Sequence, residues 1–159
     1  MKYIALICLL FSFTQDQWPG FQAGQSVYVV AVKIDTSKSD LSAESDLKSH
    51  FQSRQKFTLA KSASSADFVF VVFTQYESEF ERSKEFGASS HTRMKHALAL
   101  AVPPQVYNDY KTDLDKLKEY ALWQMDGTRD DTFVSAVFTR SVSPSNLVKQ
   151  FHSYAFKKK

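Results

Sequence analysis

The sequence predicts an α/β fold with a mixed β-sheet, and an α+β arrangement is the alternative. Three patterns lead to this prediction. Residues 27–34 (VYVVAVKI) and 68–73 (FVFVVF) are apolar on both alternating faces, as in interior strands that are covered on both sides. A helical pattern separates these two strands, and an amphipathic helical pattern over residues 143–155 closes the chain. The sequence therefore predicts an N-terminal β-α-β-β unit and a C-terminal amphipathic helix packed on the sheet.

The first helix is predicted over residues 41–54, between the two long strands. Asp40 or Ser39 provides its N-cap, because a short polar side chain accepts a hydrogen bond from the first turn. A short strand over residues 57–60 follows after a tight connection. The apolar face of the helix consists of Ala43, Leu47 and Phe51.

A charged stretch after the second long strand carries the candidate binding residues. Aromatic residues take even positions and glutamates take odd ones, which is the period of a strand with one acidic and one partly aromatic face. A helix is disfavoured because it would place glutamates four residues apart. We expect an extended arm or hairpin, with a turn over residues 87–92 (GASSHT) and a return strand over residues 94–102. The even set is Tyr76, Phe80 and Phe86, and the odd set is Glu77, Glu79, Glu81 and Glu85.

The rest of the chain predicts two elements before the closing helix. Residues 105–119 carry a helical stripe, and residues 120–125 (YALWQM) either extend that helix or begin a strand. Residues 132–139 have the composition of a strand. In the closing helix Ser143 is the expected N-cap and Pro144 lies in the first turn. The apolar face of this helix is predicted to be Leu147, Val148, Phe151, Tyr154 and Ala155.

The N-terminus has the pattern of a secretory signal peptide. Lys2 precedes an apolar run over residues 3–13, which is shorter than the about 20 apolar residues of a membrane-spanning helix. We expect residues 1–24 to be a signal peptide and polar linker, residues 25–159 to be one domain, and the protein to be secreted or periplasmic. An uncleaved segment would be its only membrane contact.

The composition excludes several kinds of chemistry. The one cysteine, Cys8, lies in the signal segment, so the mature chain would have no disulfide, thiol nucleophile or thiolate metal site. Four glycines provide neither a P-loop nor a dinucleotide fingerprint, and we expect no cofactor and no metal. The net charge of +3 and the lack of an RNA-binding aromatic motif in residues 67–73 predict no nucleic-acid partner. The spacing of the four histidines, His50, His91, His96 and His152, does not build a metal site.

One short stretch carries a resemblance to known proteins. In residues 64–71 (SSADFVFV) a polar turn leads into an apolar strand after a helix-plus-strand unit. This resembles the small α/β domains of bacterial envelope proteins, such as the amino-terminal domain of the Tol translocation periplasmic protein and the curli-secretion lipoproteins. The resemblance covers residues 27–76 and implies binding of other proteins without catalysis, and it offers no catalytic residues.

Two functions follow from the sequence as hypotheses. The first is a secreted or periplasmic non-catalytic binding module, whose partner is another envelope protein and whose binding residues are Tyr76, Phe80 and Phe86. The alternative is a secreted hydrolase with an acidic site. Its candidate carboxylates are Glu77, Glu79, Asp130 and Asp131.

Overall fold

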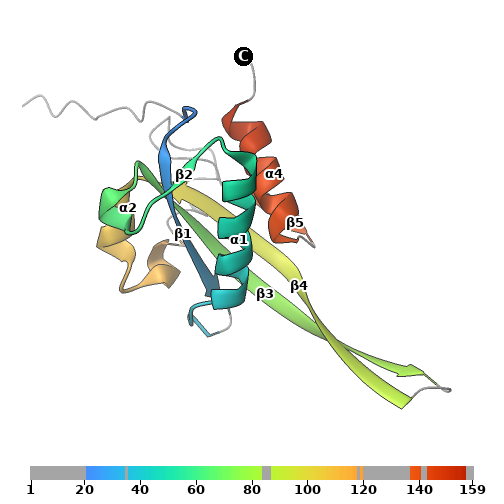
Figure 1. Ribbon diagram of the computed structural model, residues 1–159. Helices are drawn as coiled ribbons and strands as arrows, with labels where there is room; N and C mark the ends of the chain where they lie inside the picture. Colours follow the sequence, from blue (N-terminus) through green and yellow to red (C-terminus); the bar gives the residue numbers. More distant parts are fainter. Residues whose placement is uncertain are drawn as a thin grey trace, which may run out of the picture.

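The computed structural model describes residues 21–34, 36–83, 87–117, 119, 137–140 and 143–156. Within them the predicted α/β class is confirmed, because helices cover both faces of a mixed sheet with the strand order β2-β1-β3-β4-β5 (Figure 1). Strand β1 is parallel to β2 and β3, whereas β4 is antiparallel to β3 and β5. The strands are β1 (Ser26–Lys33), β2 (Thr58–Leu59), β3 (Phe68–Ser83), β4 (Gly87–Val102) and β5 (Val137–Arg140).

Helix α1 (Leu41–Arg54) connects β1 to β2 and begins where the sequence predicts. The Asp40 carboxylate accepts a hydrogen bond from the N–H of Ala43 at 3.3 Å and so caps the helix. Gln55 ends it in the left-handed conformation, with φ of 53°. The predicted apolar face, which consists of Ala43, Leu47 and Phe51, is buried.

Helix α4 (Pro144–Ala155) confirms the predicted closing helix. The Ser143 hydroxyl accepts a hydrogen bond from the N–H of Asn146 at 3.4 Å, and Pro144 occupies the first turn. The prediction that Tyr154 belongs to the apolar face is wrong, because this side chain lies in the last turn and is 54% exposed. The predicted residues that are buried are Leu147, Val148 and Phe151.

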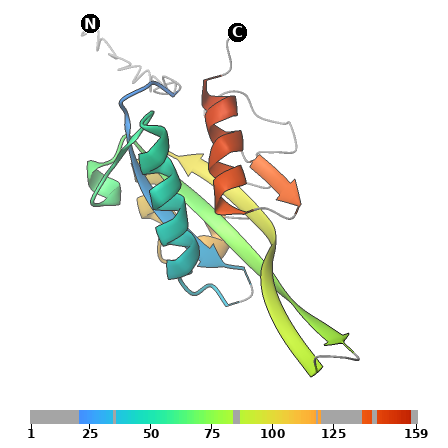
Figure 2. The same cartoon turned by 45° about the vertical axis from the view of Figure 1, so that its right-hand side comes forward.

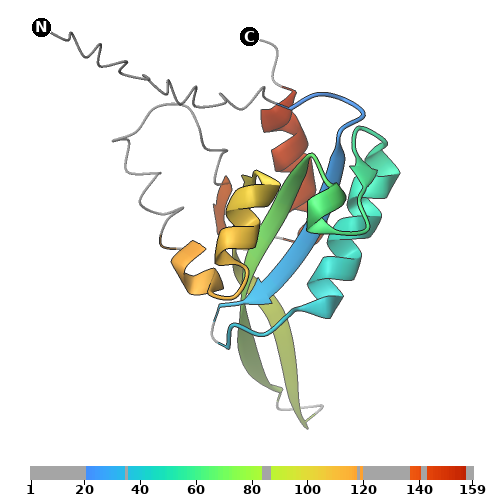
Figure 3. The ribbon, with the colours of Figure 1, turned by 90° about the vertical axis from the view of Figure 1, so that its left-hand side faces the viewer.

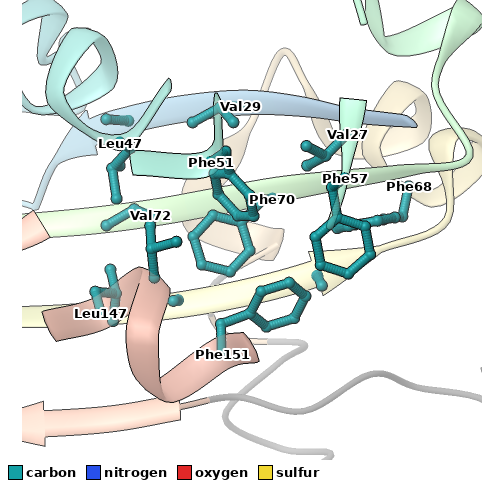
Figure 4. Close-up of a cluster of buried hydrophobic side chains, with 14 of the residues drawn as sticks. Val27, Val29, Leu47, Phe51, Phe57, Phe68, Phe70, Val72, Leu147 and Phe151 are labelled. Atoms are coloured by element: carbon teal, nitrogen blue, oxygen red, sulfur yellow. The ribbon is translucent and has the colours of Figure 1, made fainter. Parts of the chain in front are cut away.

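Helices α1 and α4 lie on the same face of the sheet and enclose an aromatic core (Figures 2 and 4). In the sheet below them Phe70 of β3 pairs in register with Ala101 of β4, and Val72 pairs with Ala99. The alanines leave space above β4, and Phe151 of α4 packs with its ring 4.8 Å from that of Phe70. Large residues on β3 and small ones on β4 therefore allow α4 to approach the sheet.

Phe21 packs into this core from the segment predicted to be a polar linker. Its ring lies 5.0 Å from the ring of Phe151 and 5.1 Å from that of Phe68, in edge-to-face arrangements. The folded unit thus includes Phe21. Residues 1–20, with the predicted signal segment, lie outside the described residues.

The opposite face of the sheet is covered by η1 (Ala63–Ser65), α2 (Pro104–Tyr110) and the helical residues 114–117 (Figure 3). Leu117 is fully buried there. The buried strand residues on this face are Val32, Val69, Val71, Phe73, Leu98, Leu100 and Val102.

The continuous helix predicted over residues 105–119 is wrong, because a turn follows Tyr110. Asp113 restarts the helix as an N-cap, since its carboxylate accepts a hydrogen bond from the N–H of Lys116 at 3.2 Å. Residues 120–125, for which the sequence predicts either a helix or a strand, lie outside the described part of the chain.

The predicted turn over residues 87–92 is also wrong. Strand β4 begins at Gly87, so all six residues belong to the return strand, and the connection falls in residues 84–86, which are not described. Of the strand predicted over residues 132–139, only β5 lies within the described residues.

Candidate functional site: the β3–β4 arm and its base

The most distinctive feature of the fold is a two-stranded arm, defined as Gln75–Ser83 of β3 and Gly87–His96 of β4. Strand β1 pairs with β3 only as far as Thr74, and β5 pairs with β4 only from His96 onward. Beyond these points, in the described part of the sheet, the two strands pair only with each other. Figures 1 and 2 show the arm extending away from the helices and twisting as it goes.

A β-bulge marks the point where the arm leaves the sheet. Gln75 pairs with His96, but the next residue, Tyr76, pairs with Met94, so Lys95 is an additional residue on β4. A bulge of this kind bends the strand pair and increases its twist. The bulge therefore bends the arm away from the direction of the sheet at its first residues.

The register places opposite charges across part of the arm. Glu77 is in register with Arg93, and Glu79 is in register with His91. Glu81 pairs with Ser89. Opposite charges at directly paired positions stabilise a strand pair, so the register of Glu77 with Arg93 suits the charges of the two strands.

A buried carboxylate fixes the base of the arm. Asp40 is 3% exposed, and its Oδ2 accepts a hydrogen bond from the Tyr76 hydroxyl at 2.6 Å and another from Thr74 Oγ1 at 2.7 Å. Its other oxygen caps α1 through the N–H of Ala43. Asp40 thus connects the covered part of β3, the start of α1 and the first part of the arm.

The same hydrogen bonds determine how these groups ionise. Burial alone would raise the pKa of Asp40, but the bonds from Tyr76, Thr74 and Ala43, together with the nearby charge of Lys33, hold that pKa below its ordinary value. Burial and the adjacent carboxylate raise the pKa of the Tyr76 hydroxyl. Asp40 is therefore ionised and Tyr76 is neutral near neutral pH.

This cluster is suited to positioning and not to acid–base chemistry. The Asp40 oxygens are occupied by hydrogen bonds and shielded from solvent, so the carboxylate cannot reach a substrate proton. Lys33 also belongs to this cluster, because its Nζ lies over the Tyr76 ring at 5.9 Å from the centroid.

The candidate binding residues from the sequence occupy different places. Tyr76 is half-buried at the base of the arm, where its hydroxyl donates to Asp40. Phe80 lies in the arm and pairs in register with Ser90, whereas Phe86 is outside the described residues. The extended arm predicted over residues 76–86 is confirmed for residues 76–83, and residues 84–86 lie outside the described part of the chain.

The carboxylates of the alternative hydrolase site are only partly described. Glu77 and Glu79 are neighbouring odd positions of the arm, and Asp130 and Asp131 lie outside the described residues. Sequence reasoning identified Asp40 as a helix cap but missed its contact with the arm. The missing signal is long-range, since Asp40 and Tyr76 are 36 positions apart.

The described residues contain no group of three or more potential metal-ligating side chains. Among the helices of the described residues, none has the length and apolar character of a membrane span.

Comparison of the chain with protein-family models, with curated proteins and with solved structures finds no match. The fold and the arm thus define a small α/β domain with a projecting β-hairpin.

Proposed function

We propose that this chain is a secreted or periplasmic binding module that acts without catalysis on another protein of the cell envelope. The observation that carries the proposal is the arm, which extends beyond every other strand of the described sheet. Its base is held by Asp40, so the arm is presented at a defined angle. A rigidly based projection that bears charged and aromatic residues is suited to contact a partner.

The energetics of a two-stranded ribbon support this role. An isolated hairpin is at best marginally stable in water, because it has no third strand or helix to cover it. The arm runs well past both β1 and β5, so beyond its base it has no such cover among the described residues. A partner that packs on the arm would supply the missing contacts.

The proposed location rests on the N-terminal pattern. Lys2 and the apolar run over residues 3–13 precede Phe21, which is the first described residue of the chain and contacts Phe68 and Phe151 in the core. Removal of a leader that ends before Phe21 would keep the contacts of Phe21 with the core. The intact mass of protein recovered from native cells tests this point, since a full-length cytoplasmic product would contradict it.

A shortened arm tests the proposed function. Glu77 and Arg93 are directly paired, so an Asn-Gly turn in place of residues 78–92 closes the hairpin there. The purified protein and this variant are used to capture proteins from the native envelope, and mass spectrometry identifies the bound proteins. We expect at least one specific partner for the wild type and its loss in the variant at unchanged thermal stability. Equal capture by both proteins would contradict the proposal.

A further inference from the structure

One edge of the arm has no strand beside it among the described residues. The N–H of Ile34 donates to the carbonyl of Thr74 at 2.8 Å, so the main-chain groups of Thr74 face β1. The two-residue repeat of a strand turns the main-chain groups of Ser78 and Arg82 toward the same side. Because β1 ends at Lys33, no described strand pairs with this side of β3 along the arm. We call it the free edge.

The free edge carries a repeated charge. Glu77, Glu79 and Glu81 are alternate positions of β3 and belong to one face of the ribbon. On the side of β3 that is already paired, Arg93 and His91 stand in register with the first two of these glutamates. A strand on the free edge would lie next to the same acidic positions.

On the basis of the proposed function, we propose that the partner binds by adding an extended segment to the free edge of β3. The segment carries Lys or Arg at alternate positions, in register with the glutamates. Main-chain hydrogen bonds to residues such as Ser78 and Arg82 provide affinity for any extended chain. The alternating basic residues provide the selectivity, because Lys or Arg beside Glu77, Glu79 and Glu81 attracts these acidic positions, whereas Asp or Glu there repels them.

The charges also argue against a second copy of this chain as the occupant. Two β3 edges would place glutamates beside glutamates, and two β4 edges would place Arg93 and Lys95 beside basic residues. Joining β3 of one copy to β4 of another would match the charges, but this head-to-tail contact leaves an open edge at each end. A different protein with a basic extended segment would pair with the free edge without forming an open-ended chain of copies.

Peptide binding tests the chemistry of the occupant. The probe is a synthetic peptide of alternating Lys and Val, and its control is the matching peptide of alternating Glu and Val. Binding to the purified protein is followed by fluorescence anisotropy. We expect the basic peptide to bind at least about tenfold tighter than the acidic one, and its affinity to fall as salt is added. Equal binding of the two peptides would overturn the proposal.

Proline substitutions test strand addition itself. Ser78→Pro removes a main-chain N–H from the free edge and leaves the bonds to β4 intact, whereas Ser78→Ala keeps the N–H. Arg82→Pro and Arg82→Ala repeat the comparison nearer the tip, in case Ser78→Pro disturbs the fold. We expect each proline variant to bind the basic peptide about tenfold more weakly than its alanine control. Equal affinity of the proline and alanine variants would overturn strand addition.

The outcomes separate this inference from the proposed function. If the shortened arm loses the native partner but both proline variants retain it, the function stands and strand addition is wrong. If the shortened arm retains the partner, both are wrong. Self-association of the wild type that Ser78→Pro abolishes would show that a second copy occupies the edge, against the proposal.

Discussion

The hydroxyl of Tyr76 donates a hydrogen bond to Oδ2 of Asp40 over 2.6 Å, and this bond connects the arm to the N-cap of α1. The two residues lie 36 positions apart. The bond forms immediately after the bulge, where the arm departs from the sheet. We infer that Asp40 fixes the direction of the arm as well as the start of the helix.

Tyr76→Phe should therefore lower the free energy of unfolding and also change the pKa of Asp40. A hydrogen bond to a charged group contributes about 1.5–3 kcal/mol, so we expect the free energy of unfolding to fall by roughly that amount. The pKa of Asp40 should rise toward its ordinary value, because the ionised form loses a donor. Urea denaturation and NMR titration measure the two effects. Tyr154→Phe, at a 54% exposed tyrosine, is the control and should change neither quantity.

The burial of His152 predicts that the protein loses stability at mildly acidic pH. Its side chain is 8% exposed, its Nε2 has no hydrogen-bond partner among the described residues, and Phe51 and Phe57 lie beside it. Burial, together with the charges of Arg54 and Lys56, lowers the pKa of His152 to about 4. As the pH falls, the His152 imidazole of the unfolded chain takes up a proton near pH 6.5, whereas the folded protein takes it up only at a lower pH.

The free energy of unfolding should then be constant above about pH 6.5 and should fall by roughly 1–3 kcal/mol between pH 6.5 and 4. Urea denaturation across this range measures it. His152→Phe keeps an aromatic ring in the core and removes the titrating group, so its stability should be nearly flat there. The Asp40 contribution begins to fall near the ordinary carboxyl pKa of about 3.9 and is lost as the pH drops through the lowered pKa of the folded protein, so most of this loss lies below the window. An equal decline in both proteins would exclude His152 as the cause.

Phe70→Ala tests the central strand. Phe70 is 1% exposed and contacts both Phe51 of α1 and Phe151 of α4. Removal of the ring should cost about 3–5 kcal/mol in the free energy of unfolding. Leu41→Ala, at a 72% exposed position, is the control and should cost less than about 0.5 kcal/mol. A loss below about 1 kcal/mol for Phe70→Ala would show that the strand is misplaced.

The sequence predicts those elements whose pattern is local. The runs that are apolar on both faces predict β1 and the buried half of β3. The capping residues Asp40 and Ser143 predict where α1 and α4 begin. The break after α2 was missed because Asp113 reads equally well as a solvated helix residue and as a cap.

The position of the hairpin turn was missed for a different reason. Residues 87–92 have turn-forming composition, yet all of them pair with residues of β3. Pairing with a partner strand outweighs local preference here. The Asp40–Tyr76 contact likewise depends on the folded sheet, and no local pattern of either residue contains it.

Phe80→Ala combined with Phe86→Ala tests the aromatic set of the arm. We expect the double variant to capture less of the native partner, because large aromatic side chains contribute strongly to interfaces. Its melting temperature should stay close to that of the wild type, since Phe80 lies beyond the part of β3 that β1 covers. Unfolding of the variant would place the aromatics in the core, and unchanged binding would make the arm a passive hairpin.

Amide hydrogen exchange, resolved by residue with and without the captured partner, tests the central claim most directly. In the free protein the N–H groups of Ser78, Phe80 and Arg82 should exchange faster than those of Glu77, Glu79 and Glu81, which face β4. Partner binding should slow exchange at the first three more than anywhere else in the domain. Unchanged exchange along the arm, with new protection on another part of the domain, would contradict the account.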